Sequence, residues 1–138
     1  MIILDTNVLS ALMRREPEAV VVAWLNAQPA ESIWLTSITL FESRVGLALL
    51  PQGKRRRLLE DSFERLLKED LDNRVLPFDT EAAAQAALIV AARRRAGCSV
   101  DMRDTQIAGI AVARRATLAT RNLRHFEDLP TPVLSPWG

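Results

Sequence analysis

Short apolar runs alternate with longer segments of helical character along the whole chain, and this alternation restricts the fold more than any other feature of the sequence. Runs suited to buried strands lie at residues 2–4, 33–35, 75–78 and 117–120, and residues 133–134 are a candidate for a fifth strand. Short strands separated by helices predict an α/β fold, with a mostly parallel sheet of four to five strands covered by helices on both faces. Such sheets place their ligand sites just outside the carboxyl ends of the strands.

Six segments between these runs carry the signals of helices. The predicted helices cover about residues 6–14, 17–27, 37–49, 54–70, 81–96 and 102–115. Pro17 suits a first helical turn, Asp79 is a good N-cap, and Gly97 is typical of a helix end. Gly46 and Gly109 lie inside two of these helices, where glycine costs about 1 kcal/mol relative to alanine. We expect a neighbouring backbone or a substrate to approach closely at Gly46, and tight packing at Gly109.

The length and composition indicate one globular domain, residues 1–138, that needs no disulfide or structural zinc to hold its core. Cys98 is the only cysteine and His125 the only histidine, which excludes an intramolecular disulfide and a zinc site of the usual Cys/His kind. No apolar run approaches the roughly 18 residues of a membrane-spanning helix, and the N-terminus lacks the basic region of a signal peptide. We therefore expect a cytoplasmic protein with no membrane partner.

The charge distribution is locally basic, although the net charge is only +1 and identifies no partner. Basic runs at residues 54–57, 93–95 and 114–115, followed by Arg121 and Arg124, are able to follow phosphates. A solvated helix face is the commoner explanation for any single run. The chain has no tyrosine and four phenylalanines, so no platform for base stacking is evident.

Three acids from distant segments are the main candidates for chemistry. Asp5 directly follows the first strand, where it can cap the next helix, serve a site at the sheet edge, or do both. Glu42 shares its helix face with mostly apolar residues, where an unpaired carboxylate is unfavourable. We expect its carboxylate to pair with Arg44 or another arginine, or with a metal ion, and we favour the metal ion. Asp104 and Asp101 resemble a capping pair, yet Asp104 lies on the helix side predicted to face the core.

Three carboxylates brought together would repel one another unless a cation lay among them. A hard divalent ion fits, since Mg²⁺ binds one or two carboxylates directly and keeps several waters. One such water is a nucleophile for hydrolysis, and the ion stabilises the charge on a phosphoryl group. The spacing alone does not establish that these acids converge.

Four sequence motifs resemble those of PIN domains. ILDTNVL at residues 3–9 resembles the opening motif, TSITLFE at residues 36–42 the second, and DTQIAGIA at residues 104–111 the third. LATRN at residues 118–122, with Phe126 and the closing SPW, resembles the end of the VapC/FitB-like branch. The match covers essentially the whole chain, in order.

The resemblance implies a Rossmann-like parallel sheet and an acidic pocket that binds Mg²⁺ or Mn²⁺ for endonucleolytic cleavage of RNA. It further implies the toxin of a type II toxin–antitoxin system, a homodimer held inactive by a cognate antitoxin protein. By position, Asp5, Glu42 and Asp104 would be the catalytic, metal-binding acids.

The resemblance also extends to residues around these acids. Thr6 matches a position whose hydroxyl supports the first acid, and Thr120 would flank the mouth of the pocket. Asn122 stands where many members carry a fourth acid; its amide can orient a water or a phosphate, but leaves open whether one or two metals bind. His125 stands where relatives often have Asp, and we favour a surface role over that of a general base.

The arginines near the expected pocket suggest how RNA would be held. Arg121 and Arg124 follow the fourth strand, and Arg44 follows Glu42 on its helix. We predict that these three side chains position the phosphate backbone.

Other functions stay open at this point. A PIN fold kept as a catalytically weak protein-binding module would explain the missing fourth acid. A phosphatase with Asp5 as its nucleophile usually has a second Asp two residues later, where this chain has Asn7. A signalling receiver domain would need a lysine after a late strand to partner Asp79, and neither Lys54 nor Lys68 lies there.

Overall fold

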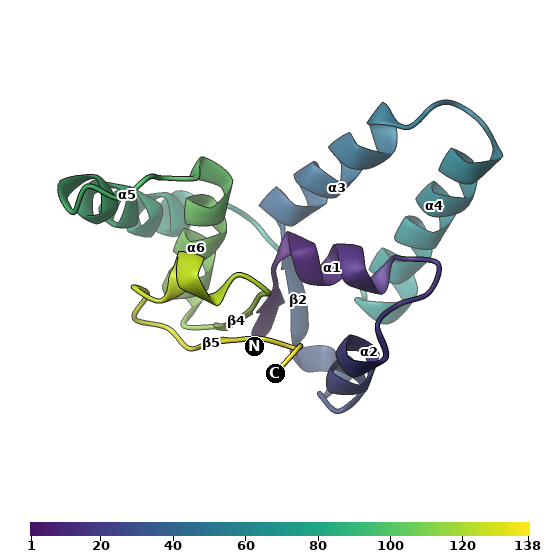
Figure 1. Cartoon of the computed structure of the whole chain (residues 1–138), viewed down its shortest axis with the longest axis horizontal. Helices are drawn as coiled ribbons and strands as arrows, with labels where there is room; N and C mark the ends of the chain where they lie inside the picture. The colour runs from purple at the N-terminus through teal and green to yellow at the C-terminus, as the bar shows by residue number, and fades with distance from the viewer.

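The computed structural model describes all 138 residues and contains one sheet of five parallel strands (Figure 1). In sheet order the strands are β3 (Val75–Leu76), β2 (Ile33–Thr36), β1 (Ile2–Leu4), β4 (Thr117–Ala119) and β5 (Val133–Leu134). Every neighbouring pair is parallel, so all five carboxyl ends lie along one edge. The predicted α/β fold is confirmed, including its fifth strand.

Six α-helices surround the sheet: α1 (Thr6–Leu12), α2 (Ala19–Asn26), α3 (Ser37–Leu49), α4 (Lys54–Arg65), α5 (Thr80–Arg95) and α6 (Met102–Arg114). Three short turns complete the chain: the 3-10 turns η1 (Ala30–Ser32) and η3 (Leu123–Phe126) and the π-helical turn η2 (Leu66–Asp70). The α5–α6 pair lies on one side of the molecule, and α3 and α4 project from the other side (Figure 1). None of the helices combines the length and apolar character that crossing a bilayer requires.

Two predicted boundaries were wrong. Pro17 does not lie in a first helical turn, because the backbone of Glu18 is extended and α2 begins only at Ala19. The third strand ends before Pro77, which has no N–H to donate to a ladder. The helix predicted over residues 54–70 does span them, but it changes from α to π geometry at Leu66.

Neighbouring residues of β1 face opposite sides of the sheet, and this alternation builds two cores. Ile3 belongs to a core beneath α5 and α6 that includes Ile107. Leu4 belongs to a second core, beneath α1, α2 and α4, that includes Phe63. A strand buried on both faces is what a short continuous apolar run predicts, and burial on both faces fixes β1 at the centre of the sheet.

The two helical glycines differ in their surroundings. A Cβ added at Gly109 would lie 2.6 Å from the carbonyl oxygen of Ala82 and 2.7 Å from the Cβ of Ala86, so close packing of α6 on α5 does explain this glycine. Nothing lies within 4 Å of a Cβ added at Gly46. The neighbouring backbone predicted at Gly46 is therefore absent from this chain, and approach of a substrate there stays a prediction.

Candidate active site

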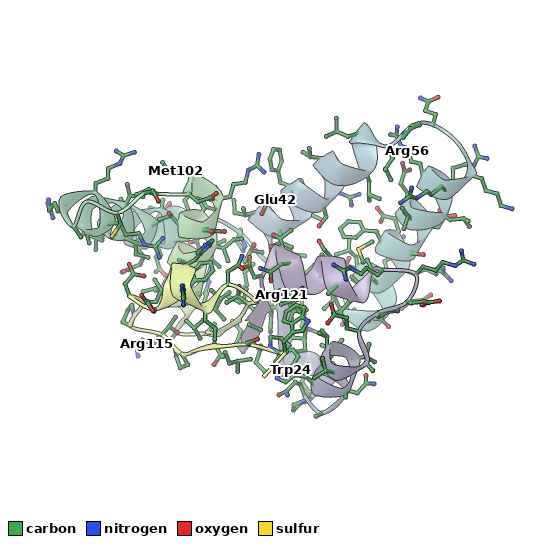
Figure 2. The ribbon with its side chains drawn as sticks, in the orientation of Figure 1. Trp24, Glu42, Arg56, Met102, Arg115 and Arg121 are labelled. Atoms are coloured by element: carbon green, nitrogen blue, oxygen red, sulfur yellow. The ribbon has the colours of Figure 1, made fainter.

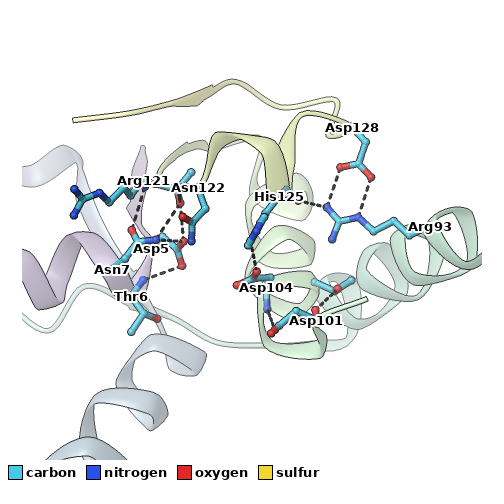
Figure 3. Close-up of polar contacts among 12 residues, drawn as sticks. Asp5, Thr6, Asn7, Arg93, Asp101, Asp104, Arg121, Asn122, His125 and Asp128 are labelled. Atoms are coloured by element: carbon cyan, nitrogen blue, oxygen red, sulfur yellow. Dashed lines mark hydrogen bonds and ion pairs between the residues drawn. The ribbon is translucent and has the colours of Figure 1, made fainter. Parts of the chain in front are cut away.

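Asp5 lies where β1 ends and α1 begins, and its buried carboxylate accepts three hydrogen bonds (Figure 3). Its Oδ1 accepts from the backbone N–H of Thr6 at 2.8 Å, which caps α1. Its Oδ2 accepts from the Thr120 hydroxyl at 2.8 Å and from Nδ2 of Asn7 at 3.3 Å. Asp5 is thus both a helix cap and the centre of a polar network at the carboxyl edge of the sheet.

Glu42 reaches the same edge from α3. Its Oε1 accepts a hydrogen bond from the Thr6 hydroxyl at 2.8 Å, and that hydroxyl also lies 3.0 Å from the hydroxyl of Thr39. Its Oε2 lies 3.4 Å from the guanidinium of Arg103 on α6. Thr6 therefore connects two acids, through its backbone N–H to Asp5 and through its hydroxyl to Glu42.

Asp104 lies half-buried in the first turn of α6. Its backbone N–H donates to Oδ1 of Asp101 at 3.0 Å, so Asp101 is the cap of this helix. The Asp104 carboxylate is left for other contacts, and its Oδ2 lies 3.1 Å from Nδ1 of His125 (Figure 3). The capping explanation for Asp104 therefore applies to Asp101 instead.

The three acids interact electrostatically. Burial raises the pKa of Asp5 to about 6 in spite of opposing hydrogen bonds from two threonines, and the charges of Asp104 and Glu42 act in the same direction as burial. Burial also raises the pKa of Asp104, although the hydrogen bond from His125 opposes the increase. A cation among these groups would favour their ionised forms.

The donor atoms at this edge suit a hard divalent cation. The three acids offer carboxylate oxygens, and threonine hydroxyls surround them, which is the oxygen-rich environment that Mg²⁺ and Mn²⁺ favour. No three acidic, histidine or cysteine side chains are gathered closely enough to form a finished coordination sphere. Glu42 and Asp104 instead contact neighbouring protein groups. The three acids nevertheless match a divalent cation in their charge and in the type of their donor atoms.

Thr120 and Asn122 follow β4 at the same edge. The buried hydroxyl of Thr120 donates to Asp5 and accepts from the backbone N–H of Asn122 at 3.0 Å. The Asn122 side chain is exposed and has no hydrogen-bond partner within the chain. Thr120 therefore orients Asp5, while the amide of Asn122 is available to a ligand.

Asn7 is a site residue to which the sequence analysis gave no role. Its Oδ1 accepts from the backbone N–H of Arg121 at 3.2 Å, while its Nδ2 donates to Asp5. Asn7 thereby fastens the chain after β4 to the start of α1. The sequence feature that could have identified Asn7 as a site residue is its place within the opening motif, two residues after Asp5.

Only part of the predicted arginine set lies at this edge. Arg44 forms an ion pair with Glu64 at 2.9 Å, and its guanidinium lies 5.3 Å from the ring centre of Phe63 on α4. Two positions along a helix point to nearly opposite sides, so Arg44 turns away from the site that Glu42 faces. Arg44 is thus engaged by α4 in this structure, and its predicted contact with the phosphate backbone stays a prediction.

Arg121 is held beside the Asp5 network by the C-terminal segment. Its guanidinium lies 4.8 Å from the ring centre of Trp137 and 3.9 Å from Glu18. The indole N–H of Trp137 donates to Glu18 at 2.7 Å. Glu42, on the inner half of α3, and Arg121 both lie in the central part of the molecule (Figure 2).

The PIN-domain family matches residues 2–131 of the chain. VapC ribonuclease Y4jK of Sinorhizobium fredii is 40% identical over 99% of this chain and 98% of the relative. Toxin FitB of Neisseria gonorrhoeae is 37% identical over 99% of both proteins. The crystal structure of FitAcB from the same species has a TM-score of 0.91 at 37% identity, covering 99% of both chains. The chain therefore belongs to the PIN-domain family, in its VapC/FitB-like branch.

Proposed function

We propose that this protein is a metal-dependent endoribonuclease and the toxin of a type II toxin–antitoxin system. The observation that supports this function most strongly is the buried carboxylate of Asp5, which lies at a sheet edge with Glu42 and Asp104 near enough to raise its pKa. Relatives over the full chain carry the names VapC ribonuclease and Toxin FitB.

In this proposal, Asp5, Glu42 and Asp104 would hold Mg²⁺ or Mn²⁺, which would supply a nucleophilic water and electrostatic stabilisation of the phosphoryl oxygens. Thr6 and Thr120 orient the carboxylates of Asp5 and Glu42 through the hydrogen bonds described above. The burial of Asp5 keeps water away from one side of the site and strengthens its interaction with a cation.

The RNA would approach over the segment that follows β4. Asn122 offers an unpartnered amide there, and Arg121 and Arg124 offer exposed positive charge. Phosphate contacts of this kind position a strand without reading its sequence. Arg103 on α6, which contacts Glu42, is a further positively charged side chain beside the acids.

Two partners belong to the same proposal. A cognate antitoxin is supported by the name of Toxin FitB. A homodimer is supported by the exposed apolar side chains Phe41, Val45 and Leu49, which follow one another at four-residue spacing along α3 and lack a partner within the chain.

The experiment that tests the proposal is cleavage of pooled cellular RNA by purified protein free of any antitoxin, with Mg²⁺ or Mn²⁺ and with EDTA. Asp5→Asn and Asp104→Asn, each shown to be folded by circular dichroism, are the comparison variants. The proposal predicts cleavage that requires metal and is lost in both variants. A folded wild-type protein that cleaves no RNA with either metal would favour the alternative of a protein-binding module.

A further inference from the structure

The turn η3 is tied to the end of α5 by a buried arginine. Arg93 is 8% exposed, and its guanidinium donates from Nε to Oδ2 of Asp128 at 2.9 Å and from one terminal nitrogen to Oδ1 at 2.8 Å. The same terminal nitrogen donates to the backbone carbonyl of His125 at 2.6 Å. We name these two side chains, Arg93 and Asp128, the clamp.

The hydrogen bonds of the clamp hold η3 in a fixed position relative to α5. A two-pronged pair of arginine and carboxylate fixes orientation as well as distance, and burial of the guanidinium is unfavourable unless its donors are satisfied. The third bond goes to a backbone atom of η3, so the clamp fixes the position of that turn. It joins residues more than thirty positions apart in the sequence, close to the acidic edge (Figure 3).

The residue that the clamp holds points its ring at the acidic edge. Nδ1 of His125 lies 3.1 Å from Asp104, while Nε2 has no hydrogen-bond partner within the chain and the side chain is 56% exposed. Contact of one ring nitrogen with a carboxylate fixes the ring plane and therefore the direction of the other nitrogen. The free Nε2 is thus directed outward from a position next to a proposed metal ligand.

We infer that His125 is a substrate-contacting residue whose Nε2 forms a hydrogen bond with the sugar–phosphate backbone of RNA, and that Arg93 and Asp128 position it. This inference rests on the proposed function. His125 lies in the turn that also carries Arg124 and follows Asn122, so a strand that crosses this turn toward the acids meets all three polar side chains.

Two amide substitutions separate the two nitrogens of the ring. The carboxamide of glutamine reaches the place of Nε2, whereas that of asparagine reaches only the place of Nδ1. The measurement is the affinity of each variant, in a non-cleaving Asp5→Asn background, for a labelled fragment of a cellular RNA that the wild type cleaves. We expect His125→Ala and His125→Asn to weaken binding by about three- to tenfold, the loss of one hydrogen bond, and His125→Gln to keep most of the affinity.

The opposite pattern, in which asparagine keeps the affinity or all three variants bind equally, would overturn the inference, since His125 would then serve only Asp104 or nothing at all. A wild type that neither cleaves nor binds RNA would remove the proposed function itself. These failures are distinguishable because the first leaves cleavage by the wild type intact.

The positioning role of the clamp is tested with Asp128→Asn, because removal of the buried Arg93 is more liable to unfold the chain. We expect Asp128→Asn to raise KM with little change in kcat, and to add little when combined with His125→Ala. Arg114→Gln is the matched control: it removes an ion pair between α6 and Asp79 at the start of α5, with no contact to η3. Additive effects of Asp128→Asn and His125→Ala, or an equal effect of the control, would show that the clamp does not act through His125.

Discussion

At the scale of single residues, Asp5 illustrates how one side chain serves structure and chemistry together. Its position after a strand indicated both a helix cap and a site residue, and the structure shows a cap bond from one oxygen and a polar network around the other. The sequence could predict its place at the sheet edge, because strand ends of a parallel sheet meet there. It could not predict the depth of burial, which depends on how β4 and Thr120 cover the carboxylate.

Asparagine in place of Asp5 is expected to stabilise the metal-free fold. The folded pKa of about 6 lies above the ordinary value of 3.8, so the folded chain binds this proton more tightly than the unfolded chain. Stability from this group is therefore complete below about pH 4 and is lost as the pH rises through 6. Because asparagine carries no charge and still caps a helix, Asp5→Asn should raise the free energy of unfolding by about 1–3 kcal/mol at pH 7 in EDTA.

Urea unfolding of both proteins at pH 7 and at pH 5 is the appropriate measurement. The advantage of the variant should shrink at the lower pH. A variant less stable than the wild type at pH 7 would show that the hydrogen bonds to the ionised carboxylate outweigh the cost of its burial.

At the scale of elements, the apolar runs predicted every strand, but two predicted boundaries were wrong where the backbone geometry near a proline decided the end of an element. Pro77 ended β3 early, and the chain after Pro17 stayed extended for a residue longer than expected. The partner of Arg44 could not be predicted for another reason: periodicity shows which residues share a helix face, but not which neighbouring helix supplies a partner. Glu64 on α4 supplies it here.

The two helical glycines should respond oppositely to alanine. At Gly109 the new Cβ would meet the backbone of α5, so Gly109→Ala should destabilise the protein by about 1–3 kcal/mol. At Gly46 the space is open, so Gly46→Ala should stabilise it by up to about 1 kcal/mol through helix propensity. Thermal unfolding of the pair tests this directly, and destabilisation by Gly46→Ala would indicate a neighbour from outside the chain.

The clamp predicts a pH dependence for the attachment of η3. The hydrogen bond from Arg93 lowers the pKa of Asp128 below its ordinary value, so the pair contributes stability above that value and loses it as the pH falls. Asp128→Asn should therefore lower stability modestly at neutral pH and flatten its fall between about pH 4 and pH 2. The effect is modest because the Asp128 side chain is 48% exposed. Identical acid unfolding curves would contradict it.

At the scale of the whole molecule, the family motifs located three acids that the fold does bring to one edge, although spacing alone gave no reason for them to meet. Asn7, Arg103 and the clamp were missed, because each acts through contacts between segments that the sequence keeps far apart. Pair contacts of this kind follow from the tertiary arrangement and leave no periodic signal.

The exposed stripe on α3 predicts how two copies of the chain associate. Phe41 and Leu49 are 57% and 80% exposed, and charge at either position should disrupt an apolar interface. If the chain forms the proposed homodimer, Phe41→Asp and Leu49→Asp are each expected to shift it to monomer in sedimentation velocity. Leu88→Asp, at an equally exposed apolar position on α5, is the matched control and should leave the mass unchanged. A dimer that survives both α3 substitutions would place the interface elsewhere.

The most direct test of the central claim is the binding of Mn²⁺ to the folded protein, measured by calorimetry without RNA. The three acids are proposed to hold one cation site together, so Asp5→Asn, Glu42→Gln and Asp104→Asn should each weaken binding by at least about tenfold, because each removes a charged oxygen ligand. Asp79→Asn, an acid outside the site, should bind as the wild type does. Wild-type affinity in all three variants, or no binding by the wild type, would contradict the claim that these acids form a metal site.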